Sequence, residues 1–290
     1  MRLSAAIVMT FGFAACATAI RMESAPDAGD RGQGGSGAGS GSGSDTNSQG
    51  SGSGTSAPTN VPLLLSEISL GPAGHEFIEI VNPTALAVPL KYLFLSDNGN
   101  YFKLPAGAAT LQSGDFLVRF PDNDIVPAHG VITVALGAST DFNTAFGSNP
   151  TYSIADGTIT VVSSLTPSLT DTGEVVVLFQ WDGSSPVVRD VDIMIAGVPT
   201  AANSIVSKSD YSQLTSAYKP DLMSIGPQAA APATGKSTKR IALEPGHETQ
   251  TGGGNGVDGD DETSEATGTT WDSSAFTVPT PGQVPSALLQ

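Results

Sequence analysis

The sequence predicts an all-β sandwich that follows a long low-complexity N-terminal segment. Short apolar runs recur from Val61 onward, turn-forming Gly, Pro, Asn and Asp residues separate them, and helical periodicity with capping residues is almost absent. About two hundred residues remain beyond the low-complexity segment, which is enough for one substantial hydrophobic core. We therefore expect one folded β domain.

The expected strands are apolar runs bounded by turn residues, and they follow one another at short intervals. Asn98-Gly99 separates two of these runs and predicts a tight hairpin, because both residues accept positive φ. Alternation along another run directs Phe77 toward the core and places Glu76 and Glu79 on a solvent-exposed face. In chain order the expected strands are 63–68, 76–81, 92–97, 100–105, 116–120, 131–136, 158–162, 174–181 and 187–195.

The N-terminus has the pattern expected of an export signal. Arg2 precedes an apolar run that ends at Ala15, which is too short to cross a bilayer and has the length of a secretory signal. The only cysteine, Cys16, follows Ala14 and Ala15 directly, and this arrangement resembles the lipobox of bacterial lipoproteins. The resemblance implies that residues 1–15 are removed as a signal peptide and that Cys16 is lipidated and anchors the chain in a membrane.

Two further features bear on the localisation of the protein. Ala17, directly after the cysteine, is compatible with sorting to the outer membrane, as the same resemblance implies. Ala17-Thr18-Ala19 is also an A-x-A cleavage pattern, and cleavage near Ala19 would release a soluble secreted protein. We expect a membrane-anchored lipoprotein at the cell surface, with soluble secretion as the alternative.

Residues 16–60 are expected to form the lipidated cysteine and a disordered tether. The segment is rich in Gly and Ser and lacks a periodic apolar pattern, so it cannot bury enough apolar surface to offset the entropy of ordering. A tether behind a lipidated cysteine would hold the folded domain away from the membrane. The expected domain then occupies residues 61–282, and residues 283–290 form a tail.

Charge and cysteine content exclude several classes of protein. The chain has 12 basic and 28 acidic residues, a net charge of -16, so its field has the wrong sign for nucleic acid or an anionic lipid surface. The one concentration of positive charge, Lys236 to Arg240, is expected to be a solvated loop. A single cysteine forms no intrachain disulfide, so the domain is held by its core, or by its core and a metal ion.

The two ends of the expected domain resemble the lamin-tail domain family. The opening carries Leu65-Ser66-Glu67-Ile68, the run Glu76-Phe77-Ile78-Glu79-Ile80-Val81-Asn82-Pro83, and Leu95-Ser96-Asp97. The close carries Thr270-Trp271-Asp272, similar to the family's last strand, and Pro279-Thr280-Pro281-Gly282, similar to its terminal turn. The resemblance implies an immunoglobulin-like β-sandwich with a central insertion, acting as a binding or attachment module on an exported protein.

An acidic, Gly-rich segment near the C-terminus is a candidate calcium site. Five carboxylates lie between Asp258 and Glu265, and hard oxygen ligands on a flexible loop are what Ca²⁺ requires. The spacing differs from that of an EF-hand, and a solvated acidic loop is the competing interpretation. The candidate ligands are Asn255, Asp258, Asp260, Asp261 and Glu262.

The sequence contains little that favours catalysis. The domain lacks a cysteine nucleophile and a serine in a strand-to-helix elbow, and none of its histidines has the spacing of a zinc helix. A carboxylate pair of the glycosidase kind would need Glu67, Glu76, Glu79 or Asp97 to converge. We therefore expect no catalytic residues and no certain cofactor.

The expected function is that of a non-catalytic cell-envelope lipoprotein. Its lamin-tail-like domain would act as a binding, attachment or structural module, with a protein or polysaccharide partner at the cell surface and no nucleic acid. The alternative is a calcium-dependent exported hydrolase or a calcium-dependent adhesin that uses the loop 255–265.

Overall fold

The structure, a computed structural model, describes residues 61–164, 166–169, 173–197, 206, 208, 229–243, 267–272, 274–283 and 285–290. All of them belong to the compact unit Ser53–Gln290. Cys16, the Gly/Ser segment and the candidate calcium ligands Asn255 to Glu262 lie outside the described residues. Within the described ranges, no helix combines the length and the apolar character that a membrane-spanning segment needs.

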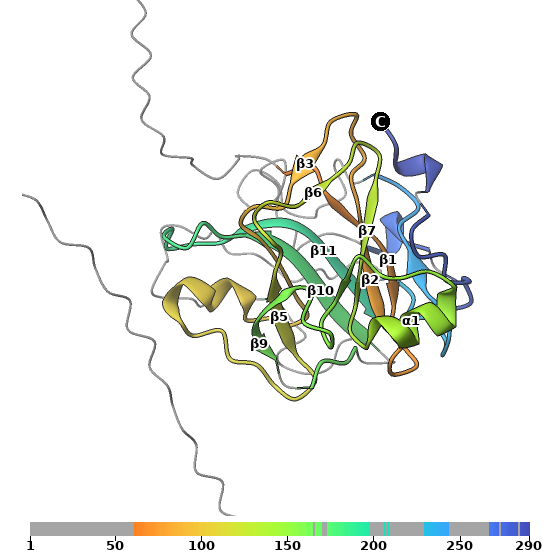
Figure 1. Cartoon of the computed structure of the whole chain (residues 1–290), viewed down its shortest axis with the longest axis horizontal. Coiled ribbons are helices and arrows are strands. Elements are labelled where there is room, and N and C mark those ends of the chain that lie inside the picture. The colour runs from red at the N-terminus through yellow and green to blue at the C-terminus, as the bar shows by residue number, and fades with distance from the viewer. Residues whose placement is uncertain are drawn as a thin grey trace, which may run out of the picture. The chain divides into compact units, whose positions relative to one another are not determined.

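Two five-stranded sheets lie against each other and confirm the predicted all-β sandwich (Figure 1). The first sheet has the order β12-β1-β2-β7-β8, and all of its pairs are antiparallel except β7 with β8. Its strands are β1 (Leu64–Ser69), β2 (Phe77–Val81), β7 (Val131–Ala135), β8 (Tyr152–Ser153) and β12 (Thr238–Lys239).

The second sheet has the order β11-β10-β4-β5-β9 and is antiparallel throughout. Its long hairpin β10–β11 is closed by a turn in which Asp182 Oδ1 accepts hydrogen bonds from the backbone N–H groups of Ser184 and Ser185. The strands are β4 (Leu93–Ser96), β5 (Phe116–Arg119), β9 (Thr160–Ser164), β10 (Gly173–Gln180) and β11 (Arg189–Gly197). A small third sheet pairs β3 (Val88–Pro89) with β6 (Ile125–Val126).

The main core lies between the two sheets, and alternation along the strands decides which residues enter it. In β10, Val176 and Leu178 point into this core, whereas Val175 and Phe179 join a second cluster on the outer face of the same sheet. Because both faces of β10 are covered, the strand is a continuous apolar run instead of an alternating one.

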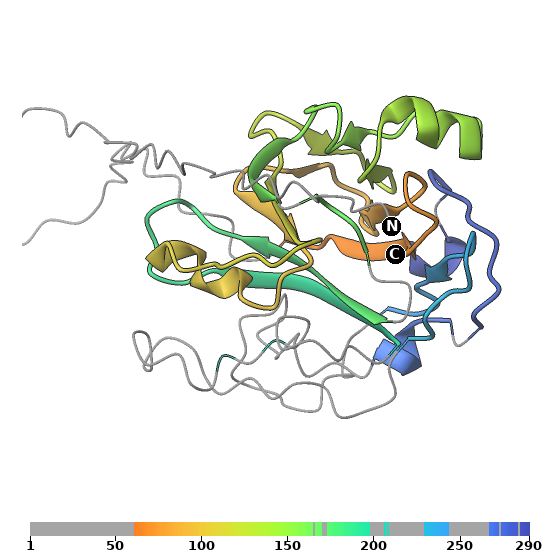
Figure 2. The same cartoon turned by 90° about the horizontal axis from the view of Figure 1, so that it is seen from below.

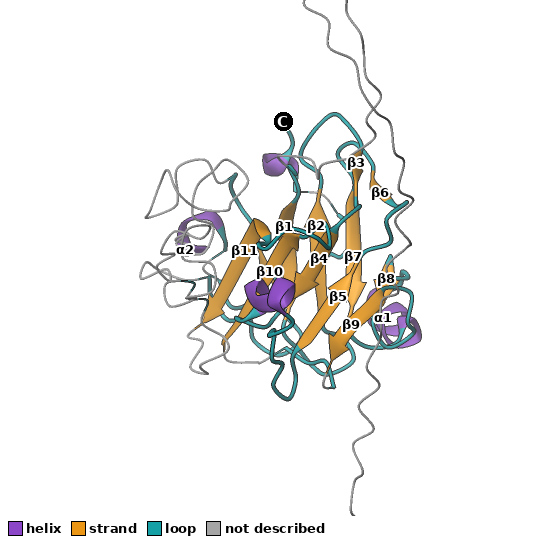
Figure 3. Ribbon diagram, turned by 90° about the vertical axis from the view of Figure 1, so that its left-hand side faces the viewer, coloured by secondary structure: helices purple, strands orange, loops and turns teal. Residues whose placement is uncertain are grey.

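Short helices cover the outer faces of the sheets. The helices are η1 (Tyr101–Ala106), α1 (Ser139–Phe146), α2 (Thr267–Thr270) and η4 (Ser286–Leu288). Figure 3 shows η1 in front of β10, where Tyr101 and Phe102 enter the outer cluster. Phe142 of α1 packs on Phe77 of β2 at the outer face of the first sheet, with ring centroids 5.7 Å apart.

The C-terminal residues also pack on the domain. Leu288 of η4 is fully buried beside Leu64 and Val81, and the backbone N–H of Gln290 donates to the carbonyl of Pro83 over 3.0 Å. The described part of the expected tail, 285–290, therefore covers one end of the outer face of the first sheet.

The prediction of a hairpin at Asn98-Gly99 is wrong, because the chain enters η1 there instead of a strand. The side chain of Asn98 accepts a hydrogen bond from Asn100 N at 2.7 Å, and its carbonyl accepts one from Tyr101 N at 3.1 Å, so a helical turn begins at once. That turn allows the adjacent residues Tyr101 and Phe102 both to be buried, which a strand with one covered face does not. β4 pairs with β5 and β10 instead.

Three other expectations are corrected. Helix α1 lies where no helix was expected, and its C-terminal Gly147 adopts φ 75°, as a helix C-cap requires. The basic segment Lys236 to Arg240 is not a solvated loop, since it contains β12 and ends in a buried arginine. Trp271, expected in a closing strand, follows α2 and forms only an isolated bridge with Arg240.

Candidate functional site

Two glutamates lie side by side under the surface of the first sheet. Glu67 of β1 and Glu79 of β2 are direct cross-strand partners on the face that points away from the sandwich core. Only 1% of Glu67 and 0% of Glu79 is exposed. Like charges directly opposite each other destabilise a sheet, and burial adds to that cost, so this pair needs compensating partners.

The expectation that Glu76 and Glu79 lie on a solvent-exposed face is wrong. Glu76 is 4% exposed and accepts a hydrogen bond from Leu169 N at 2.8 Å. Glu79 lies on the outer face of the sheet together with Phe77, which was expected in the core, and other parts of the chain cover that face. Alternation separates the two faces of a strand, and it does not reveal whether the polar face meets water or protein.

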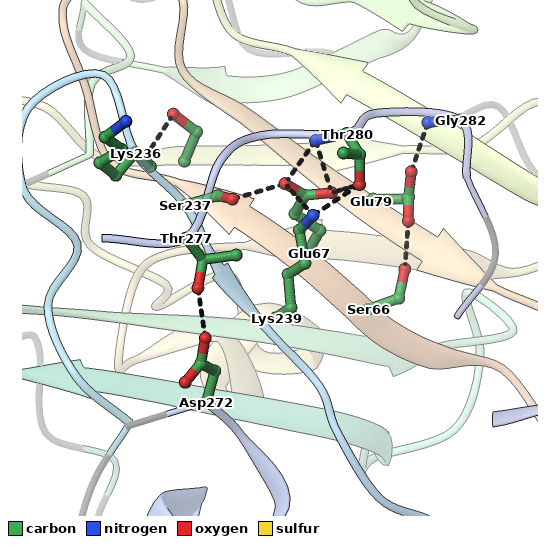
Figure 4. Close-up of polar contacts among 11 residues, drawn as sticks. Ser66, Glu67, Glu79, Lys236, Ser237, Lys239, Asp272, Thr277, Thr280 and Gly282 are labelled. Atoms are coloured by element: carbon green, nitrogen blue, oxygen red, sulfur yellow. Dashed lines mark hydrogen bonds and ion pairs between the residues drawn. The ribbon is translucent and has the colours of Figure 1, made fainter. Parts of the chain in front are cut away.

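The covering segment comes from the C-terminus. Figure 4 shows Thr280 and Gly282 above the two carboxylates, and Figure 2 shows the C-terminal trace in blue beside the orange strands β1 and β2. Thr280 N donates to both oxygens of Glu67 at 3.0 and 3.2 Å, and Gly282 N donates to Glu79 Oε2 at 2.6 Å. Gly282 has φ 84°, a backbone conformation that favours glycine.

Side-chain hydroxyls supply the remaining donors. Ser66 Oγ donates to Glu79 Oε1 at 2.8 Å, and Ser237 Oγ donates to Glu67 Oε1 at 2.5 Å. The nearest cation, Lys239, is partly exposed, and its Nζ lies 3.7 Å from Glu67 Oε1. Two buried carboxylates therefore share neutral donors and one loosely placed positive charge.

This environment changes the acidity of the pair. Burial raises the pKa of Glu79 from 4.5 to about 7, although the hydrogen bonds from Ser66 and Gly282 act in the opposite direction. Burial likewise raises the pKa of Glu67, against the donors from Ser237 and Thr280. Loss of hydration outweighs the hydrogen bonds in both cases, so Glu79 changes its protonation state near neutral pH.

A carboxylate pair with a raised pKa has the chemistry of general acid–base catalysis, but a substrate must reach it. Here the oxygens of Glu67 and Glu79 accept hydrogen bonds from the chain itself, and the segment that contains Thr280 lies over them. In this arrangement, Glu67 and Glu79 hold the C-terminal segment on β1 and β2.

A pocket of about 270 Å³ is lined in part by the same segment. Val278 and Pro279 form one wall, and the turn between β1 and β2 contributes Pro72 and His75. Phe146, at the end of α1, closes a third side, and its ring meets that of His75 edge-on with 6.2 Å between centroids. The lining is mainly apolar, with one imidazole.

The four carboxylates considered for catalysis do not converge. Glu67 and Glu79 meet, whereas Asp97 accepts a hydrogen bond from Phe116 N at 2.7 Å in the other sheet. Burial raises the pKa of Asp97 well above its ordinary value. In the part of the chain that the structure describes, no three His, Cys, Asp or Glu side chains are grouped as a metal site.

A second set of buried charges, on β11, was not expected from the sequence. Asp192 forms an ion pair with Arg240, both side chains being 0% exposed, and Asp190 forms one with Lys208. Strand β11 reads Asp-Val-Asp-Ile, an alternation typical of a strand with one wet face, so its aspartates appear solvated in sequence. Cations and hydrogen-bond donors from other parts of the chain make their burial possible.

Comparison with known proteins leaves the family open. No family model matches the chain, and no curated protein matches it. Among solved structures, the chain is similar to a DUF4876 family protein from Bacteroides thetaiotaomicron, with 14% identity and a TM-score of 0.39, over 78% of this chain and 75% of that one. A likeness at this level bears on neither the function nor the site.

Proposed function

We propose that this protein is a cell-envelope lipoprotein, anchored through Cys16, whose lamin-tail-like β-sandwich is a non-catalytic binding, attachment or structural module. The observation that supports a non-catalytic role is the use of the buried glutamates. Glu67 and Glu79 accept hydrogen bonds from Ser66, Ser237, Thr280 and Gly282, and so join distant parts of the chain.

The pocket beside the C-terminal segment supports a binding role. Its volume of about 270 Å³ suits one ring or one branched side chain, and its walls combine the apolar Phe146 and Val278 with the imidazole of His75. Concave, largely apolar sites with a few polar groups are where proteins bind small groups of a partner. We take this pocket as the first place to look for a partner's contact.

The anchor is tested by replacing the cysteine in the full-length chain. Wild-type protein should fractionate with membranes and label with a radioactive fatty acid, whereas Cys16→Ser should do neither. A wild-type chain that is found in the medium with an N-terminus near Ala19 would establish soluble secretion instead.

The non-catalytic role is tested with chromogenic phosphodiester, glycoside and ester substrates. The full-length chain should turn over none of them above a buffer blank, with and without millimolar calcium. Activity that is lost in the triple variant Asp258→Ala, Asp260→Ala, Asp261→Ala would establish the metal-dependent hydrolase in its place. Activity that is lost in Glu79→Gln alone would assign catalysis to the buried pair.

A further inference from the structure

Lys208 and Asp190 form a buried contact that differs from the other ion pairs of the described residues. Nζ of Lys208 contacts Oδ2 of Asp190, and the two side chains are 0% and 1% exposed. Asp190 lies on β11, and the two residues are 18 positions apart in sequence. A compact ammonium group is strongly hydrated in water, so its complete burial beside a carboxylate is costly.

The surroundings of this contact are aromatic. The hydroxyl of Tyr101 donates a hydrogen bond to Oδ1 of Asp190 at 2.6 Å, while Lys208 occupies Oδ2. The Tyr101 ring centroid lies 4.9 Å from that of Phe179 and 5.6 Å from Lys208 Nζ. An amine and a phenol therefore hold the two oxygens of one carboxyl group inside a cluster of apolar and aromatic side chains.

The neighbouring pair on the same strand is a natural comparison. Arg240 Nη2 meets both oxygens of Asp192 at 2.7 and 2.8 Å, and that pair is equally buried. A guanidinium stays protonated and is not a nucleophile, whereas a lysine amine becomes a nucleophile when it loses its proton. Of these two pairs on β11, the pair of Lys208 and Asp190 has the chemistry to react.

We propose that Lys208 and Asp190 condense to an intramolecular isopeptide bond. A proton first passes from the ammonium group to the carboxylate, which removes both buried charges. Nζ then attacks Cγ of Asp190, the C–N bond forms and the Cγ–Oδ2 bond breaks. Oδ2 leaves as water with two protons that both came from Nζ, so the balance is ammonium plus carboxylate to amide plus water.

Two features of the site favour this step. Tyr101 donates to Oδ1, the oxygen on which negative charge develops during the attack, and a fixed donor in a dry site stabilises such charge. The reacting groups are already held in contact, so the reaction does not have to bring them together. The product replaces two buried ions by one neutral amide, which removes the cost of desolvating them.

The isopeptide bond would be a covalent cross-link within the domain. With only Cys16, the chain forms no intrachain disulfide, although exported proteins commonly use them. An amide between β11 and position 208 would close the outer cluster irreversibly and would survive reducing conditions. This proposal stands independently of the binding function proposed above.

The test is peptide mapping of the denatured full-length chain by mass spectrometry. Trypsin cleaves after Arg189, Lys208 and Lys236, and resists the Lys219-Pro220 bond. We expect a peptide 190–236, uncleaved after Lys208 and about 18 Da below its sequence mass, the loss of one water. A peptide 190–208 that carries its full sequence mass would overturn the proposal.

Three variants sharpen the result. Lys208→Arg should restore cleavage at position 208 and the full mass, and a persisting mass deficit there would contradict the proposal. Tyr101→Phe keeps the ring and should slow condensation, seen as an increased fraction of cleaved peptide in freshly purified chain. Arg240→Lys is the matched control, because it places an amine beside Asp192 without a phenol and should show no loss of water. If the lysine introduced at position 240 of that control condensed with Asp192 to the same extent as Lys208 with Asp190, the role assigned to Tyr101 would be contradicted.

Discussion

The aspartates of β11 and the glutamates of β1 and β2 are equally buried, yet different groups neutralise them. Asp192 faces a fully buried guanidinium, whereas Glu67 and Glu79 face each other and receive hydroxyl and amide donors with one partly exposed lysine. The first pair is a fixed ionic link between the two sheets, because Arg240 Nε and Asp192 Oδ2 also bond to Leu65 of β1. The second pair responds to pH.

The difference shows how a β-sandwich holds charge. Where a cation of matching geometry lies in contact, the carboxylate and its partner act as one unit, and removing either leaves a buried charge. Where the partners are neutral donors, the cost of burial is met by taking up a proton instead. Variants of Arg240 test the ion pair, and variants of Glu79 and Ser237 test the glutamate pair.

The largest effect is expected at the fixed ion pair. Arg240→Ala removes the cation and leaves the carboxylate of Asp192 buried between the sheets, so the free energy of unfolding should fall by about 3 to 5 kcal/mol. Chemical denaturation of the full-length chain measures this loss. The double variant Asp192→Leu, Arg240→Leu should recover much of it, since it leaves no uncompensated charge.

A surface pair provides the control. Arg119 and Asp122 form an ion pair at 2.7 Å, with side chains 37% and 41% exposed. Arg119→Ala should cost no more than about 1 kcal/mol, because solvent screens an exposed pair. Equal losses at Arg240 and Arg119 would contradict the role assigned to burial.

The second effect is a pH dependence that originates in the glutamate pair. The pKa of Glu79 is about 7 in the folded chain against 4.5 ordinarily, so the folded state retains a proton that the unfolded state loses. The stability that Glu79 contributes is therefore fully present below about pH 4.5 and is lost as the pH rises through 7. The loss that Glu79 contributes is about 3 kcal/mol above pH 7.

Glu79→Gln should remove this part of the pH dependence, because the amide mimics the protonated acid. Thermal unfolding between pH 5 and pH 8 should give a flatter profile for the variant, with the gain in stability confined to the alkaline side. Asp182→Asn is a matched control at an exposed turn, where backbone donors lower the pKa of Asp182 instead. A profile unchanged by Glu79→Gln would show that the pair does not titrate as described.

A smaller effect is expected at the hydroxyl donor of Glu67. Ser237→Ala removes the hydrogen bond at 2.5 Å and leaves a carboxylate oxygen short of one donor, so the loss should be about 1 to 3 kcal/mol. Thr280→Ala retains the backbone N–H that bonds to Glu67 and should cost less. Denaturant midpoints of the two variants, compared at pH 8, test this order, and the reverse order would contradict it.

The smallest expected effect is that of calcium. If the loop 255–265 were a site with a dissociation constant a hundredfold below the free calcium, the ion would add about 2.7 kcal/mol. The melting temperature of a domain of this size would then rise by roughly 5 to 10 °C. For the proposed non-catalytic module we expect no shift between millimolar calcium and chelator, and a rise of that size would favour the adhesin or the hydrolase.

Local pattern was enough to place most strands. The apolar runs that become β1, β2, β4, β5, β7, β10 and β11 lie within about two residues of their predicted positions, because alternation and flanking turn residues are properties of the chain itself. The prediction of a hairpin at Asn98 failed because the same dipeptide can also lead into a helical turn, when the side chain of Asn98 accepts a hydrogen bond from Asn100 N. The burial of two successive aromatic residues, Tyr101 and Phe102, favours the helical turn over the hairpin.

The buried charges could not be predicted in the same way. Glu67 reaches Ser237 across 170 residues and Thr280 across 213, and Arg240 reaches Asp192 across 48. In sequence, Lys236 to Arg240 is a basic run, and such a run ordinarily indicates solvated charge. Its burial depends on partners that no local pattern specifies.

By itself, the sequence determined the all-β class, the alternation of the strands, the strongly negative charge and the single cysteine, because each depends only on residue type and spacing. The tertiary structure alone decided which polar faces are covered, how Glu67 and Glu79 are joined under the C-terminal segment, and which cation meets which aspartate. Those features depend on contacts between distant segments, and the free energy of a buried charge is decided by the group that lies against it.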